Sequence, residues 1–389
     1  MGGGLVYMYY LLKKIFQNMD YWLIGAVCLL AAFGMVCIAS ATHVNLGEGY
    51  DMVLKQFLFF ASGIGLMIAA SIIDYDLFSR YTLPLYLFNL ALLIIVLLIG
   101  TGRDTSRWIA IGPLTLQPSE FCKIIMIFIL SKLLSDHKDR VNELPFLFFI
   151  LGISAVPTLL ILKQPALSAA MVIVAITCIL LFLAGLDYTY IRNVLIIAVP
   201  LLLFVLWDVS REDPLILDKI LKPHQFNRIL AFVDPSRDPS LYYQTEKSIS
   251  AIGSGQLTGN GLFQGTLNQL SYLPEPQNDF IFSVIGEEFG FLGCIAVLGV
   301  LLFVVFRCIV IAISARDTFS QYLAAGVAGM FAFQTFVNVG VVTGILPNTG
   351  ISLPFISYGG SSMWTNMIAI GLVQNICKRS SKSLFEGVS

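Results

Sequence analysis

Long apolar runs separated by short polar connections dominate the chain. A helix that crosses a membrane needs on the order of 20 mainly apolar residues, and about ten segments reach or approach that length. They lie at roughly 21–40, 53–73, 81–100, 120–134, 146–163, 166–184, 193–207, 281–306, 321–345 and 363–377. The fourth and seventh are short, so we expect them to be tilted, partly re-entrant or extended by flanking residues. The pattern predicts an all-α polytopic integral membrane protein with about ten transmembrane helices.

One polar stretch of about seventy residues, Asp208 to Phe280, interrupts this pattern between the predicted seventh and eighth spans. Charged and apolar residues alternate along it, which favours amphipathic segments on the membrane over a separate soluble domain. The stretch closes on Asp279, directly before an apolar run that begins at Phe280. We therefore expect a single membrane-embedded domain, residues 1–389, which includes a long loop at 208–280.

Composition supports the membrane assignment. Hydrophobic residues make up 57% of the chain and charged residues only 12%, whereas a soluble domain has about 25% charged residues. Mean hydropathy is +0.83. The net charge of −1 and the lack of a basic tail or basic-aromatic stripe give no indication of a nucleic-acid partner. Seven cysteines without a CxxC spacing and three isolated histidines give no sign of a zinc site.

The distribution of basic residues predicts an orientation. If the amino terminus is cytoplasmic, most Lys and Arg residues fall in inner connections, and the short outer ones hold little beyond Arg103, Arg107, Lys55 and Lys163. The positive-inside rule then places both termini in the cytoplasm. The loop at 208–280 is too long for that rule, and on this count of spans it faces the extracytoplasmic side.

The connection before the fourth span has more polar residues than a simple turn requires. Pro118 suits the first turn of a helix. Glu120 and Lys123 are three residues apart and would form an ion pair on one helix face. Both a surface pair and a functional pair fit this pattern, because charges that enter a span are often functional. Trp108 on its own is more typical of the aromatic belt at a membrane interface.

Two further outer stretches are rich in glycine and polar residues. In the long loop, four glycines between residues 253 and 261 indicate turns, or backbone N–H groups that approach a phosphate. Arg228 in the same loop is by default a solvated surface charge. Between the last two predicted spans, residues 347–362 gather hydroxyls and glycines that are costly in lipid. We expect them to line protein or water, although a plain outer loop also fits.

Three carboxylates near the start of the eighth span need an explanation. Asp279 could cap this helix, since Asp is among the favoured N-cap residues, or it could take part in a reaction. Glu287 and Glu288 lie a couple of turns deeper and need a polar interior or partners.

Together these stretches resemble the shape, elongation, division and sporulation (SEDS) family of peptidoglycan glycosyltransferases over nearly the whole chain. The most specific matches are Arg107-Trp108-Ile109, Gln117-Pro118-Ser119-Glu120 with Lys123, Gln164-Pro165, Arg228 before Asp234-Pro235, Ala251-Ile252-Gly253-Ser254-Gly255, Leu273-Pro274-Glu275, Asp279-Phe280-Ile281-Phe282, Glu287-Glu288 with Gly290, and Leu353 to Ser362. The run from Ala251 to Gly255 and the Gly265-Thr266 step favour the rod-shape (elongation) branch over the division and sporulation branches.

The chain also departs from the family pattern. Ala166 and Ser168 stand where Asp and Gly are usual around an outer-edge motif, and Gln256 replaces a common second glycine. Leu267 and Asn278 stand where Gln and Thr are common. These differences bear on the hairpin between the fifth and sixth spans and on the placement of the acceptor.

The resemblance implies polymerisation of lipid II into glycan strands at the outer face of the bacterial cytoplasmic membrane during cell elongation. Asp279 is then the expected general base of an inverting transfer, a role typically worth 10²–10⁴-fold. The residues expected to bind substrate are Glu120, Lys123, Arg107, Trp108, Arg228, Ser357, Ser361 and Ser362. A class B penicillin-binding protein (a transpeptidase), the elongation machinery and membrane lipids are the implied partners. No cofactor is firmly implied; a divalent cation such as Mg²⁺ could bridge the phosphates, but no metal ligand set can be recognised.

Two other functions fit part of the pattern. A lipid II flippase or lipid carrier also needs charge inside the membrane and an outward-facing cavity, but it predicts polar residues along a path to the inner side. A non-catalytic scaffold of the wall-synthesis complex would tolerate the departures from the family pattern. The polar stretches gather on one face, which favours chemistry at that face.

Overall fold

The computed structural model describes residues 17–42, 49–74, 80–100, 107–112, 114–164, 166–211, 223–234, 239–270, 272–273 and 275–386. Ten long helices in these ranges correspond to the ten predicted spans, so the all-α membrane fold is confirmed. They are α2 (Tyr21–Ala41), α3 (Gly49–Ile72), α5 (Thr82–Ile99), α6 (Pro118–Asp136), α7 (Leu144–Lys163), α8 (Leu167–Leu183), α9 (Tyr188–Ser210), α14 (Ile281–Ile313), α15 (Thr318–Val342) and α16 (Gly360–Glu386).

Seven of these helices are long and apolar enough to cross a membrane by themselves. The others are α6, α8 and α16. Helix α8 has only 17 residues, and α6 carries the charges of Glu120, Lys123 and Lys132 along its length. Much of α6 is buried among its neighbours, where polar side chains can find partners that lipid would not provide.

The helices begin where local chemistry favours a start. The Asp20 carboxylate accepts the Leu23 N–H at 3.1 Å before α2, and Asp317 accepts the Ser320 N–H at 2.9 Å before α15. Pro118 starts α6, where its missing N–H costs nothing. The fourth and seventh predicted spans extend through their flanks, to 19 residues in α6 and 23 in α9. Extension, one of the three expected solutions, is therefore the one the protein adopts.

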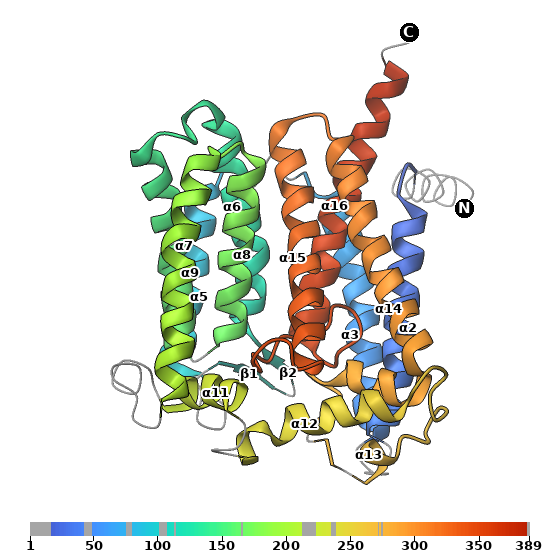
Figure 1. The fold of residues 1–389 in the computed structure, drawn as a ribbon. Coiled ribbons are helices and arrows are strands. Elements are labelled where there is room, and N and C mark those ends of the chain that lie inside the picture. Colours follow the sequence, from blue (N-terminus) through green and yellow to red (C-terminus); the bar gives the residue numbers. More distant parts are fainter. Residues whose placement is uncertain are drawn as a thin grey trace, which may run out of the picture.

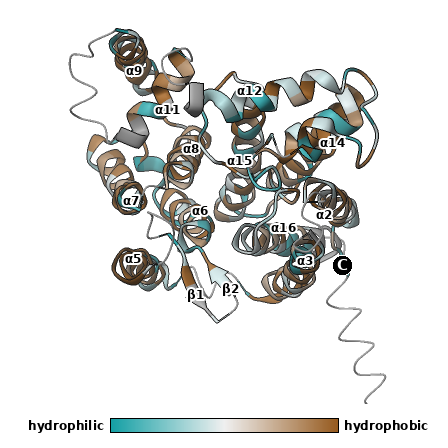
Figure 2. Cartoon of the chain, turned by 90° about the horizontal axis from the view of Figure 1, so that it is seen from below, coloured by the Kyte–Doolittle hydropathy of each residue, from teal (hydrophilic) through white to brown (hydrophobic). Residues whose placement is uncertain are grey.

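The bundle has a buried centre and an apolar surface. Helix α15 packs against α6, α8 and α14, and α16 packs along α3. Figure 2 shows α9 and α5 at the periphery of the bundle, and most of their residues are hydrophobic. Most of the apolar side chains of α9 are exposed, as expected for a helix whose surroundings are lipid rather than water.

Shorter elements gather at one end of the bundle (Figure 1). They are the strands β1 (Ile109–Ile111) and β2 (Leu114–Leu116) and the helices α11 (Pro223–Val233), α12 (Pro239–Ser254) and α13 (Thr266–Gln269). The strands form an antiparallel hairpin in which Ile109 pairs with Leu116. The sequence pattern did not predict this hairpin.

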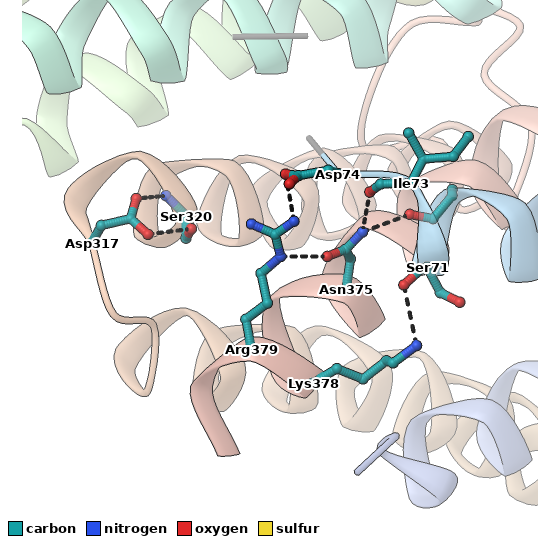
Figure 3. Close-up of polar contacts among 9 residues, drawn as sticks. Ser71, Ile73, Asp74, Asp317, Ser320, Asn375, Lys378 and Arg379 are labelled. Atoms are coloured by element: carbon teal, nitrogen blue, oxygen red, sulfur yellow. Dashed lines mark hydrogen bonds and ion pairs between the residues drawn. The ribbon is translucent and has the colours of Figure 1, made fainter. Parts of the chain in front are cut away.

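The opposite end is held by polar contacts between α3 and α16 (Figure 3). The Asn375 amide donates to the carbonyls of Ala70 at 3.0 Å and Ile73 at 2.5 Å. The Arg379 guanidinium pairs with Asp74. Because this ion pair is largely exposed, we expect little stabilisation from it. The hydrogen bonds from the buried Asn375 side chain hold the two helices in register.

Candidate active site

A polar cavity of about 480 Å³ lies at the end of the bundle that carries the hairpin. Its walls come from α3, α6, α8, α15 and α16, from the hairpin, and from the segments before α14 and α16. The predicted site residues that line it are Asp279, Glu120, Lys123, Arg107, Trp108, Ser361 and Ser362. Stretches that lie far apart in the sequence therefore meet around one volume.

Asp279 belongs to the turn that leads into α14. Phe280 occupies the N-cap position of this helix, so Asp279 stands one residue outside it. Its side chain is partly exposed and lines the cavity. The geometry favours a carboxylate that a ligand can reach over one that serves as the N-cap.

The backbone of Asp279 is fixed by α15 and by the segment before α16. The amide nitrogen of Asn338, a side chain that is 1% exposed, donates to the Asp279 carbonyl at 2.8 Å and to the Ile351 carbonyl at 2.7 Å. Gly350 has a φ of +76°. A Cβ at Gly350 would lie 3.1 Å from the Asp279 Oδ2, so this backbone passes directly beside the carboxylate.

Glu120 and Lys123 form the ion pair that their spacing predicts. The Lys123 Nζ lies 2.8 Å from the Glu120 Oε2, and the side chains are 2% and 12% exposed. A charge this deeply buried is tolerated only with a partner, because desolvation costs several kcal/mol per ion. The pair therefore lies buried in the wall of the cavity. The alternative that it is a surface ion pair is wrong.

Arg107 and Trp108 lie directly before β1, at the entrance to the hairpin. The Arg107 Nε donates to the Gln164 carbonyl at 3.1 Å, which ties the hairpin to the end of α7. The Gln164 amide in turn donates to the Leu93 carbonyl at 2.9 Å. Trp108 is partly buried and lines the cavity, as expected for a substrate-binding residue, and its place in an aromatic belt stays a prediction.

The serines after α15 have different environments. The Gln117 N–H donates to the Ser361 Oγ at 2.9 Å, and the hydroxyls of Ser352 and Ser362 are 3.3 Å apart. Ser357 does not line the cavity: its buried Oγ accepts the Leu353 N–H at 2.9 Å. It therefore stabilises the turn of its own segment.

Tyr358, one residue further along, does line the cavity. Burial raises the pKa of its phenol above the ordinary value of 10.0. The hydroxyl is therefore protonated at neutral pH and can donate a hydrogen bond to a ligand.

Arg228 belongs to α11, but its side chain lies outside the described residues. Its contact with a substrate stays a prediction.

Glu287 and Glu288 have partners that the sequence did not identify. The Glu287 carboxylate accepts the N–H groups of Leu267 at 2.7 Å and Asn268 at 3.2 Å, at the start of α13. The Ser40 hydroxyl donates to Glu288. Both carboxylates are buried and lie outside the cavity lining. They fasten α13 and α2 to the first part of α14.

The glycines of the long loop pack against the same part of α14. A Cβ at Gly255 would lie 1.9 Å from the Gly286 carbonyl oxygen, and one at Gly259 would lie 2.1 Å from that of Glu288. At Gly253 nothing lies within 4 Å. Close backbone packing explains Gly255 and Gly259 without a phosphate.

The structure shows the surroundings or the backbone conformation of three residues that depart from the family pattern. Ser168 and Asn278 line the cavity, so both change the surface that a ligand meets. Gln256 has a φ of +48°, a left-handed conformation that glycine adopts at no steric cost. This conformation explains why a glycine is common at that position.

Five polar residues that were not among the predicted substrate-binding residues also line the cavity: Thr115, Gln117, Glu275, Gln334 and Ser352. Gln117, Glu275 and Ser352 stand in stretches that the sequence had already singled out. Thr115 stands in a polar connection, where threonine is common, and Gln334 had one signal, a carboxamide within an apolar span.

In the described ranges no three His, Cys, Asp or Glu side chains form a group that could hold a metal ion. The donors present therefore do not make a ligand set of their own. An ion such as Mg²⁺ would take most of its ligands from a bound phosphate and water.

The cavity can bind and act on an anionic, hydroxyl-bearing ligand. Its lining includes the partly exposed Asp279 carboxylate, which can accept a proton, the exposed Glu275, the buried Lys123 ammonium group, and serine hydroxyls that can donate. This set can remove a proton from a hydroxyl while a neighbouring negative charge is stabilised.

Comparisons with known proteins identify the family of the chain. A model of a family described as "Cell cycle protein" (FtsW, RodA and SpoVE) matches residues 21–382. The probable peptidoglycan glycosyltransferase FtsW of Trichlorobacter lovleyi is 36% identical over 94% of this chain and 95% of its own length. Stage V sporulation protein E of Bacillus subtilis is 34% identical over 93% of this chain and 97% of its own.

Two solved structures share the fold. A chain from a study of the structural coordination of polymerization and crosslinking by a peptidoglycan synthase complex has a TM-score of 0.78, at 27% identity over 94% of this chain and 99% of that one. The rod shape determining protein RodA of Thermus thermophilus has a TM-score of 0.67, at 24% identity over 93% of this chain and 97% of that one.

Proposed function

The chain belongs to the FtsW, RodA and SpoVE family, a multi-pass membrane family of peptidoglycan glycosyltransferases, and from this premise we propose that it polymerises lipid II with Asp279 as general base. The observation that carries the proposal is the meeting of Asp279 with the buried Glu120–Lys123 pair in one polar cavity. Its substrate is a disaccharide-peptide on a polyprenyl pyrophosphate.

The reaction is a single displacement. The acceptor sugar hydroxyl attacks the anomeric carbon of the donor, the bond from that carbon to the pyrophosphate oxygen breaks, and the pyrophosphate leaves with the electron pair. Asp279 takes the proton of the attacking hydroxyl. Because an α-linked donor gives a β-linked product, one inversion suffices.

One well-placed carboxylate is enough for this transfer. Glycoside hydrolases need a second carboxyl group as acid, because an alkoxide leaves poorly. Pyrophosphate leaves readily when cations neutralise its charge. Lys123, which Glu120 orients, lines the cavity and would face the pyrophosphate, and Arg228 is a further candidate.

The other cavity residues have supporting roles in this proposal. Arg107 and Trp108 form the mouth, and Ser361 and Ser362 offer hydroxyls to the phosphates. A divalent cation would add positive charge at the pyrophosphate, but no step above depends on it.

The orientation follows from the positive-inside pattern. On this pattern both termini are cytoplasmic, and the cavity faces the outside of the cytoplasmic membrane, at the end of the bundle where α11, α12 and α13 also lie (Figure 1). A transpeptidase of the penicillin-binding class is the partner that cross-links the product.

The branch of the family is a separate question. The run from Ala251 to Gly255 and the Gly265-Thr266 step favour RodA and cell elongation. The relatives of 33–36% identity that are named FtsW favour a role in division. Depletion in the native cell distinguishes the two, since round cells indicate elongation and long filaments indicate division.

The experiment that tests the activity uses purified protein. Incubated with lipid II, alone and with its transpeptidase, the protein should form glycan polymer. Transfer of lipid II across a proteoliposome bilayer without polymer would instead support a flippase. Neither polymer nor transfer in the presence of the partner would support a scaffold.

A further inference from the structure

The side chain of Gln334 is the unexplained polar group of the cavity. It stands in α15, a helix apolar enough to cross the membrane, and it is 2% exposed. Its Oε1 has no hydrogen-bond partner among the described residues. A buried carboxamide without partners costs about 1–3 kcal/mol, so its presence in the wall of a cavity needs a reason.

Two other buried glutamines of the bundle are fully engaged, and a third, Gln164, donates to the Leu93 carbonyl while its Oε1 has no partner among the described residues. Gln374 accepts the Asp20 N–H at 2.8 Å and donates to the Asp20 carbonyl at 2.9 Å. Gln56 likewise accepts from Gly359 and donates to Ser357. Both hold neighbouring segments together. Gln334 makes no such contact within the described part of the chain, so packing does not account for it.

The position of Gln334 links it to the reacting group. It lines the same cavity as Asp279, Glu120 and Lys123. One helical turn further along α15, Asn338 fixes the Asp279 carbonyl. Residues four apart share a helix face, so α15 presents one amide that positions the base and a second that is left for a ligand.

We propose that Gln334 binds the acetamido group of a substrate sugar and so selects N-acetylated substrate. This inference rests on the proposed function and deepens it. A carboxamide offers one acceptor and two donors, and an acetamido group offers the complementary N–H and C=O. Two reciprocal hydrogen bonds would satisfy both groups inside the cavity. A neutral amide is poorly suited to the pyrophosphate, for which Lys123 is available.

Hydrogen bonds from Gln334 to an acetamido group would make the protein selective for N-acetylated substrate. A site that is built to hydrogen-bond a substrate group rejects the analogue that lacks the group, because the polar atoms of the site are then left unpaired. Wild-type protein should therefore prefer lipid II over an analogue whose N-acetylglucosamine carries a free amine. Gln334→Leu should reduce this preference.

The test compares Gln334→Leu with Thr335→Val. Thr335 is the next residue of α15, is also buried with an unpartnered hydroxyl, and does not line the cavity. For each variant, kcat/KM of polymerisation is measured with lipid II and with the free-amine analogue. Binding of both lipids to detergent-solubilised protein is measured in parallel.

We expect Gln334→Leu to lower kcat/KM and affinity for lipid II by about 10- to 100-fold and to bring the ratio between the two lipids close to one. Thr335→Val should keep the wild-type ratio. The inference is overturned if Gln334→Leu keeps the wild-type ratio or if Thr335→Val loses it equally. If wild-type protein makes no polymer, the proposed function fails, and the binding ratios still decide the role of Gln334.

Discussion

Gly350 shows how little space surrounds the Asp279 carboxylate. A methyl group on Gly350 would lie 3.1 Å from the Asp279 Oδ2, and the positive φ of this residue would itself be strained by a Cβ, at about 1–2 kcal/mol. We predict that Gly350→Ala lowers the polymerisation rate at least about tenfold while the protein still inserts. Gly152→Ala in α7, where nothing lies within 4 Å, is the control. Equal activity of both variants would contradict the close approach.

Variants of Glu120 and Lys123 separate the effect of this buried ion pair on stability from its effect on activity. Lys123→Met alone leaves a buried carboxylate without its cation, so the free energy of unfolding should fall by about 3–5 kcal/mol. The double variant Glu120→Gln, Lys123→Met removes both charges and should recover much of this loss, as measured by thermal unfolding in detergent. Its polymerisation rate should stay low, because the cation that faces the pyrophosphate is missing. Recovery of activity along with stability would show that the pair is only structural.

At the scale of single residues, the sequence predicted which residue types form the site better than it predicted which side chains touch one another. The i,i+3 spacing correctly predicted the Glu120–Lys123 pair. The hydroxyl of Ser357 turned inward to its own loop, because residue type does not tell which serine of a polar run faces a cavity. Gln334 was missed because its cavity is assembled from segments that are distant in the chain.

Helices α12 and α14 approach each other closely at glycines, so a substitution there should displace α12. Gly255→Ala would place a Cβ 1.9 Å from the Gly286 carbonyl oxygen, so the end of α12 must move away from α14. We predict a lower melting temperature and lost activity. Gly253→Ala, with nothing within 4 Å, should be neutral or stabilise by about 0.5–1 kcal/mol. Similar behaviour of the two variants would argue against tight packing at this contact.

The elements themselves were largely predictable, because apolar length is a strong signal. All ten expected spans correspond to helices. The β1–β2 hairpin was not foreseen, since strands of three residues carry almost no pattern. The break at Gly290, where φ is +64° inside α14, was also hidden, because the apolar run continues through it.

For the whole molecule, polymerisation at the outer face requires that the two ends of the bundle face opposite sides of the membrane. The hairpin, α11 and α12 lie at one end, and the carboxyl-terminal part of α16 lies at the other (Figure 1). We predict that alkaline phosphatase fused after Arg211 is active and that a fluorescent protein fused after Glu386 folds in the cytoplasm. The reverse pattern would place the cavity on the inner side and would exclude polymerisation at the outer face.

The central claim is that Asp279 takes the proton of the attacking hydroxyl. The most direct measurement is the rate of lipid II polymerisation by purified Asp279→Asn in the presence of the transpeptidase. Glu246→Gln, which removes an exposed carboxylate of α12 outside the cavity lining, is the control. We predict a loss of about 10²–10⁴-fold for Asp279→Asn with lipid II binding retained, and a wild-type rate for Glu246→Gln. A wild-type rate for Asp279→Asn would contradict the account.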